Sequence, residues 1–270
     1  MPHCRLLHQA KSDAHLTTLL EEAGNVFAVF DRQDSGCWSA GIETPEGRWF
    51  VKLATTEAAH TSMQRVRELH QHVQHPAIVP LVHGLTCADG LVNIYPWESG
   101  EVLYHPTVGT RPDRTDPSQP MARFRALPLH QAQGALQQVL DAHERICDAG
   151  WIAVDFYDGC TMYDFTAHQM RLIDFDEYRP EPFDVPGDRL PGSSRYLAPE
   201  ELRHSGRIDQ RATVHALGRM LRLLLDAGDH EAAWRGTTEQ LDVIRKATDP
   251  DPARRWPTVH DLNAAWITTR

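Results

Sequence analysis

The sequence has no Cys-x-x-Cys pair, no long uncharged apolar run and no excess of basic residues. Its five cysteines are scattered and odd in number, which favours free thiols in a reducing compartment. The apolar stretch 216–225 is interrupted by Arg219 and Arg222, so we expect no contact with a membrane. Lys and Arg number 27 against 37 Asp and Glu, a formal charge of −10, which disfavours nucleic-acid binding. Because the first residues also lack the apolar core of a signal peptide, a cytoplasmic location is expected.

Residues 25–97 have the pattern of a small, mostly β unit that contains one helix. The stretch 44–47, Thr-Pro-Glu-Gly, is favourable for a hairpin turn. Apolar residues at helical spacing predict a helix over 56–74. Residues 1–24 form a weakly amphipathic lead-in to this unit. Strands are predicted over residues 26–30, 39–43, 48–53, 78–83 and 91–95.

Residues 98–270 are predominantly helical in pattern. Residues 105–128 are rich in Pro, Arg, Asp and Thr without periodicity, and we interpret them as an inserted surface loop, here called the insert. The sequence also predicts that only helices follow Glu200. Helices are predicted over residues 129–149, 210–226, 239–248 and 258–266.

Two aspartates flank a predicted hairpin within this helical part. Asp155 closes the apolar run 152–154, and Asp174 closes the run 172–173. Between them, residues 161–165 are predicted to form a strand and the next four residues its turn. Two carboxylates at one end of a hairpin suit a divalent cation and a hydroxyl nucleophile. The alternative is that each aspartate only begins a turn.

This stretch resembles the catalytic and metal-binding segments of the protein kinase superfamily. Those segments contain His-Arg-Asp, a hairpin and then Asp-Phe-Gly. Residues 192–200, Gly-Ser-Ser-Arg-Tyr-Leu-Ala-Pro-Glu, look like the end of that family's activation segment, and we call them the closing segment. The resemblance implies an α+β, two-lobed fold with an N-lobe at 25–97 and a C-lobe at 98–270. It also implies ATP and Mg²⁺ as cofactors.

The resemblance assigns roles to individual residues. Asp155 corresponds to the catalytic aspartate, Asp174 to the magnesium ligand and Lys52 to the lysine that pairs the nucleotide's phosphates. Tyr95 and Trp97 fall where the family's hinge holds adenine, so the nucleotide is expected in the cleft behind residues 95–98.

Gly36 and Gly41 stand where the family has its glycine-rich loop, and we expect them in a hairpin turn close to the phosphates. The family's helix also carries a glutamate that pairs with the lysine. Its usual spacing lands on Val66 here, and Glu57 and Glu68 are the nearby acids.

Several positions depart from the family pattern. Tyr157 stands in place of a lysine that steadies the phosphoryl group. Cys160 stands in place of the asparagine that binds the second magnesium ion, and a thiol is a poor ligand for that hard cation. The neighbouring Asp158 is the candidate replacement. Thr213 replaces an aspartate that usually precedes Gly218 by five residues.

The closing segment carries two further assignments. Ser193 falls where the family has a Ser or Thr that faces the catalytic aspartate. Glu200 is expected to pair with Arg255, about 55 residues later, and so to fix the closing segment to the helical lobe. The Ala-Pro-Glu motif at 198–200 favours a protein kinase over a small-molecule kinase.

The sequence therefore predicts ATP- and magnesium-dependent phosphoryl transfer to Ser or Thr of a protein substrate. One alternative is a pseudokinase that binds nucleotide or protein as a scaffold, because the aspartate loop has lost several of the family's residues. The second alternative is a small-molecule kinase.

Overall fold

The structure is a computed structural model that describes residues 5–31, 35–105, 111–185, 190–203 and 206–269. It confirms the α+β class expected from the sequence. Within the described residues the chain forms two compact units. The first takes in the described residues up to 74 and from 79 to 99, and the second takes in 75–78, 100–105 and the described residues from 111 onward.

An antiparallel sheet is the centre of the first unit. Its strands follow the order β1-β2-β3-β5-β4. The prediction of a strand over residues 78–83 is wrong, because β4 begins only at His83. Just before this stretch, the Ala77 carbonyl accepts from the Leu172 amide at 2.6 Å. The strands are β1 (Asn25–Phe30), β2 (Cys37–Thr44), β3 (Gly47–Ala54), β4 (His83–Cys87) and β5 (Gly90–Pro96).

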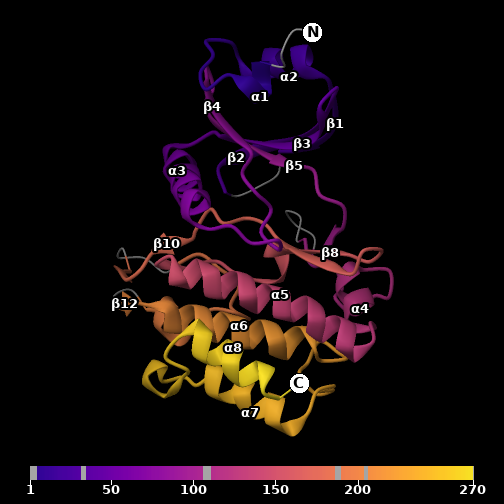
Figure 1. Ribbon diagram of the computed structural model, residues 1–270, viewed down its shortest axis with the longest axis vertical. Coiled ribbons are helices and arrows are strands. Elements are labelled where there is room, and N and C mark those ends of the chain that lie inside the picture. Colours follow the sequence, from indigo (N-terminus) through magenta and orange to yellow (C-terminus); the bar gives the residue numbers. More distant parts are fainter. Residues whose placement is uncertain (1–4, 32–34, 106–110, 186–189, 204–205, 270) are drawn as a thin grey trace. The chain divides into compact units, whose positions relative to one another are not determined.

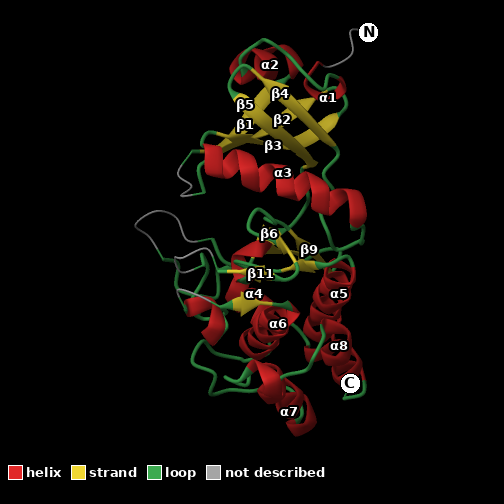
Figure 2. Ribbon diagram, turned by 90° about the vertical axis from the view of Figure 1, so that its left-hand side faces the viewer, coloured by secondary structure: helices red, strands yellow, loops and turns green. Residues whose placement is uncertain are grey.

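Helices cover both faces of this sheet (Figure 2). On one face lie α1 (Arg5–His8) and α2 (Leu16–Ala23), which share a core with alternate residues of the strands. On the other lies α3 (Glu57–His72), which packs against Ala54 and Leu91. The lead-in therefore belongs to the core of the first unit.

The second unit contains the hairpin and a stack of helices (Figure 1). In this stack α6 packs against α5, α7 and α8. Its helices are α4 (Pro120–Arg125), α5 (Leu129–Asp148), α6 (Gln210–Leu224), α7 (Thr238–Ala247) and α8 (Val259–Ile267), with 3₁₀ turns η1 (Asp158–Cys160), η2 (Pro199–Leu202) and η3 (Pro252–Arg254). Its strands are β6 (Glu101–Val102), β7 (Trp151–Ile152), β8 (Thr161–Asp164), β9 (Gln169–Leu172), β10 (Arg179–Pro180), β11 (Phe183–Asp184) and β12 (Arg207–Ile208).

Side-chain caps fix where several of these helices begin. The Thr56 hydroxyl accepts from the Ala59 amide at 3.2 Å at the start of α3. Asp209 caps α6, and Thr258 caps α8 in the same way. Each cap satisfies an amide that the helix itself leaves without a partner.

Two expectations for the second unit are wrong. The insert is not wholly a surface loop, because it contains α4, whose Met121 and Phe124 side chains are fully buried; residues 106–110 of the insert lie outside the described part. A strand, β12, follows Glu200 and pairs with β11. Among the described residues, no helix is long and apolar enough to cross a membrane.

Candidate active site

Asp155 and Asp174 both have a left-handed backbone, with φ of 58° and 63°. Residues other than glycine rarely adopt this conformation, although aspartate tolerates it better than most. Such residues persist where the surrounding structure holds them, and they cluster at functional sites. The two aspartates predicted to be functional therefore share an uncommon backbone geometry.

The phenylalanine after each aspartate anchors it in one buried aromatic cluster. The Phe156 ring lies 4.4 Å from the His143 ring, and the Phe175 ring lies 5.0 Å from the Tyr178 ring, between centroids. The His143 Nδ1 donates to the Val139 carbonyl at 2.8 Å, so its Nε2 accepts from the Tyr178 hydroxyl, also at 2.8 Å. Burial lowers the pKa of His143 to about 4, so this imidazole is neutral.

The hairpin between the aspartates brings their ends together. Strands β8 and β9 pair in register from Thr161 opposite Leu172. One step further, the Ile173 amide donates to the Cys160 carbonyl at 2.9 Å. Burial, followed by the charges of Asp174 and Asp155, raises the pKa of the Cys160 thiol far above its usual range. Both carboxylates therefore lie near Cys160, as the hairpin pattern predicts.

Cys160 and Asp158, the two candidate ligands for a second magnesium ion, both make other contacts. Cys160 is buried, and its Sγ donates to the Asp155 carbonyl at 3.3 Å, whereas a metal ligand must be a thiolate. Asp158 is 1% exposed, and Arg114 Nε donates to its Oδ2 at 3.3 Å. Over the described part of the chain, no group of three or more His, Cys, Asp or Glu side chains could hold a metal ion. Asp174, in contrast, is exposed.

The closing segment is tied to the helical stack by the pair that its motif predicts. Arg255 Nη1 and Nη2 donate to Glu200 Oε1 and Oε2 at 2.6 and 2.8 Å. Arg255 is 2% exposed and also donates to the carbonyls of Asp249 and Arg211. The Ser193 carbonyl accepts from the amides of Tyr196 and Leu197, so Ser193 begins a turn within the closing segment.

Thr213 holds the start of the aspartate loop, residues 155–160. Its hydroxyl accepts from the Ala153 amide at 3.0 Å, and both residues are buried. The sequence marks Thr213 only as a departure from the family. A hydroxyl at this position accepts one hydrogen bond without placing a charge in the core.

Lys52 lies in a polar row across the sheet of the first unit. It pairs with Ser39 of β2 and Asn93 of β5, and it is 8% exposed. Because side chains alternate along a strand, Lys52 shares with Ala54 the sheet face that α3 covers.

The α3 residue that enters this row is an arginine. Arg67 Nε donates to the Asn93 side-chain oxygen at 2.7 Å, and its Nη2 donates to the carbonyls of Val92 and Leu85. Burial lowers the pKa of Arg67. Glu57 and Glu68 are exposed, so neither takes this position. The sequence did not point to Arg67, although the family's spacing for the helix glutamate falls on the adjacent Val66.

The predicted glycine-rich turn is wrong for Gly41. This glycine lies inside β2, opposite Phe50 of β3. A Cβ there would come within 2.6 Å of the Trp97 ring and 2.7 Å of the Phe27 ring. Gly36 does lie immediately before β2, with φ of 69°, and residues 32–34 lie outside the described part.

Tyr95 and Trp97, the predicted hinge residues, belong to an aromatic cluster on the sheet. The rings of Trp97 and Phe27 meet edge to face at 4.7 Å, and Tyr95 and Phe50 lie 6.4 Å apart, between centroids. These rings are half-buried, so the cluster presents a partly accessible aromatic surface.

Comparison with known proteins adds no assignment. No protein-family model matches the chain, and no curated protein matches it.

Proposed function

We propose that the chain transfers the γ-phosphoryl group of ATP to a Ser or Thr hydroxyl of a protein, with magnesium. The observation that carries the proposal is the pair Asp155 and Asp174, both left-handed. Cys160 joins the two, because its Sγ donates to the Asp155 carbonyl and its own carbonyl accepts from the amide of Ile173, the residue before Asp174. An ordinary β-hairpin does not require a left-handed aspartate both before its first strand and after its second. Two carboxylates held in this way suit a hydroxyl nucleophile and a hard cation.

Each residue has a distinct role in this proposal. Asp155 orients the substrate hydroxyl and accepts its proton. The exposed Asp174 carboxylate is a hard oxygen donor that fits magnesium, whereas the thiol of Cys160 and the ion-paired Asp158 do not. Lys52 supplies a point charge to the phosphates. Magnesium, when bound, would neutralise charge that develops on those phosphates.

The finer fold belongs to the same proposal. We propose a two-lobed, kinase-like arrangement in a cytoplasmic protein. The bidentate Glu200–Arg255 pair supports it, because the resemblance requires that contact across about 55 residues of sequence. The buried free thiols of Cys87, Cys147 and Cys160 support a reducing compartment.

A pseudokinase is the second candidate, and one observation favours it. The residue at the second-magnesium position is a buried thiol whose hydrogen goes to a backbone carbonyl. A scaffold that binds nucleotide would tolerate this arrangement, because only transfer needs the full set of metal ligands.

Radiolabel transfer from ATP separates the two candidates. Asp155→Asn keeps the shape of the side chain and removes its charge, so transfer to a protein substrate should fall about 10²–10⁴-fold while ATP affinity changes little. Asp164→Asn is the matched control, because Asp164 caps the far turn of the same hairpin. Equal background transfer by wild type and Asp155→Asn, with ATP binding retained, would identify a pseudokinase. Transfer to small molecules but not to protein would favour a small-molecule kinase.

A further inference from the structure

Three arginines of the insert tie it to the rest of the second unit. Arg123 donates to both oxygens of Glu101 at 2.8 Å. Arg125 donates to the Leu223 carbonyl at 3.1 Å and to Asp229 at 2.9 Å. Arg114 is the one of the three that reaches the aspartate loop, through Asp158. The described part of the insert is therefore attached to several elements around the loop.

The Arg114 side chain is held on two sides. Its guanidinium lies 3.3 Å from the centroid of the Tyr104 ring, and its Nε donates to Asp158. Its backbone is fixed as well, because Asp113 accepts from the amide and the hydroxyl of Thr115, on either side of Arg114. A cation stacked on a ring and paired with a carboxylate has few alternative positions.

Asp158 depends on this contact. It is 1% exposed, and burial raises its pKa while the charge of Arg114 lowers it. The buried Tyr196 hydroxyl of the closing segment also faces this carboxylate and lowers its pKa. Removal of Arg114 takes away the ion pair of this buried carboxylate, so we expect Asp158 to shift or to become protonated.

Short contacts connect Asp158 to Asp155. The Asp158 carbonyl accepts from the Thr161 hydroxyl at 2.8 Å. The Cys160 amide donates to the Tyr157 carbonyl, and its Sγ donates to the Asp155 carbonyl. A shift of Asp158 therefore changes the 3₁₀ turn η1 and the hydrogen bond that holds the left-handed Asp155.

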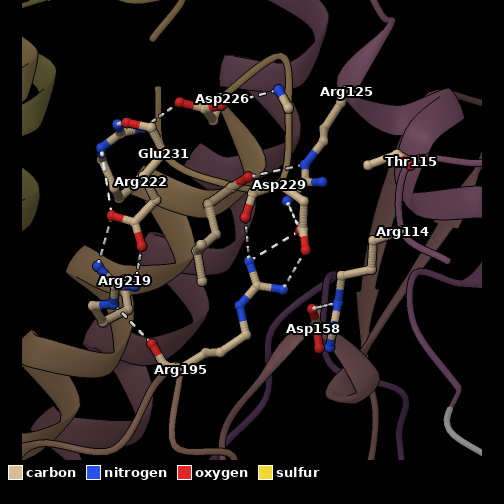
Figure 3. Close-up of polar contacts among 12 residues, drawn as sticks. Arg114, Thr115, Arg125, Asp158, Arg195, Arg219, Arg222, Asp226, Asp229 and Glu231 are labelled. Carbon is tan, nitrogen blue, oxygen red and sulfur yellow. Dashed lines mark hydrogen bonds and ion pairs between the residues drawn. The ribbon is translucent and has the colours of Figure 1, made fainter. Parts of the chain in front are cut away.

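A second set of contacts links the insert to the closing segment (Figure 3). Arg195 donates to Asp229 at 3.0 Å, and Asp229 also accepts from Arg125. The charge of Arg195 acts on Asp158 together with that of Arg114. Asp158 thus lies between the insert and the closing segment, and only Arg114 forms an ion pair with it among the described residues.

We propose that Arg114 is a positioning residue, which holds Asp158 and thereby fixes the aspartate loop that presents Asp155. This inference rests on the proposed phosphoryl transfer for its effect on rate. Its effect on the loop is independent of that function. The insert is then part of the active-site framework.

Kinetics of Arg114→Met test the effect on rate. We expect kcat to fall about 10–100-fold with KM for ATP unchanged, because misplacement of a catalytic group by about 1 Å costs rates of that order. Arg123→Met is the matched control, since Arg123 lies on the same insert and also stacks on a ring, that of Phe165. A folded Arg114→Met variant with wild-type kcat would overturn the proposal. Arg114→Lys, which keeps the charge, should recover part of the rate.

Thiol labelling tests the loop without any reference to catalysis. Cys160 is 2% exposed and is held by the contacts that Arg114 supports. Native-state alkylation with iodoacetamide, read at Cys160 by peptide mass spectrometry, should be at least about tenfold faster in Arg114→Met, because local opening sets the rate. Arg123→Met should label like wild type. Unchanged protection of Cys160 would overturn the proposal even if the chain proves to be a pseudokinase.

The double variant Arg114→Met/Asp158→Asn separates positioning from charge compensation. It removes both charges, so it should fold even if Arg114→Met does not. If Arg114 positions the loop, Cys160 stays labile and kcat stays low in the double variant. Recovery of both the wild-type kcat and the protection of Cys160 would show that Arg114 only neutralises Asp158, and would overturn the proposal.

Discussion

The Glu200–Arg255 pair and the aspartate loop are both buried polar arrangements in the second unit, but they differ in how completely they are satisfied. Both oxygens of Glu200 accept from Arg255, whose other hydrogens go to backbone carbonyls. In the aspartate loop, Asp155 is left-handed, and the buried Asp158 has a single ion pair among the described residues, with Arg114 at 3.3 Å.

This difference separates stability from function. A saturated, bidentate pair gives one well-defined geometry, and loss of either partner is costly. A loop with an uncommon backbone and a buried carboxylate held by one ion pair gives up stability, which proteins tolerate mainly at functional sites. We therefore expect substitutions at the pair to change unfolding, and substitutions in the loop to change transfer.

The largest expected effect on stability is at the pair. Glu200→Ala and Arg255→Ala should each lower the free energy of unfolding by about 3–5 kcal/mol, because each leaves a buried charge without its partner. The double variant should lose less than the sum of the two. Urea denaturation measures all three. The exposed pair Asp242 and Arg245 supplies the control, whose substitution should leave the unfolding midpoint nearly unchanged. Strictly additive losses at Glu200 and Arg255 would contradict the role of the pair.

The adjacent Glu201 provides a further test, because it is buried and forms no ion pair among the described residues. It is 2% exposed, and its Oε2 accepts from the Ala198 amide at 2.7 Å. Burial raises its pKa to about 7. Since the folded pKa exceeds the unfolded one, its contribution to stability is complete below pH 4.5 and is lost as pH rises to about 7.

Comparison of wild type with Glu201→Gln isolates this titration. The stability of wild type relative to the variant should fall by about 3 kcal/mol between pH 4.5 and 7, since each pKa unit corresponds to about 1.4 kcal/mol. His143 and His215 have lowered pKa values and titrate in part of this range, but both proteins contain them. Unfolding free energies at several pH values provide the test, and a difference that does not vary with pH would show that Glu201 is charged when folded.

Local patterns predicted much of this molecule. Alternation and turn chemistry located the first three strands, and the apolar runs before Asp155 and Asp174 located the hairpin. The Ala-Pro-Glu motif even predicted a long-range contact, Glu200 with Arg255. The strands and the hairpin follow from short stretches whose residues largely determine their own geometry, whereas the Glu200–Arg255 contact was expected from the family resemblance.

Tertiary packing determined what the sequence did not reveal. Helix α4 has six residues, too few for helical periodicity to appear, yet it buries two large side chains. Glycine is common in turns, and the sequence therefore suggested a turn at Gly41. In the structure Gly41 lies in β2, where its lack of a side chain leaves room for the Trp97 ring. The partners of Arg67 and Arg114 lie about 25–45 residues away, and an arginine can pair with any acceptor that the fold brings near.

Cys160 provides the smallest expected effect. Cys160→Ser keeps a donor for the Asp155 carbonyl, so unfolding should change by less than about 1 kcal/mol, whereas Cys160→Ala removes the donor and should cost about 1 kcal/mol. The two variants also test the metal assignment. The hard oxygen of serine would bind magnesium better than the thiol does. If residue 160 faced the metal, Cys160→Ser would lower the magnesium concentration needed for half-maximal transfer. Because Sγ is directed to a backbone carbonyl, we expect no such shift. A clear decrease would return Cys160 to the metal site and remove it from the hydrogen bond that holds Asp155.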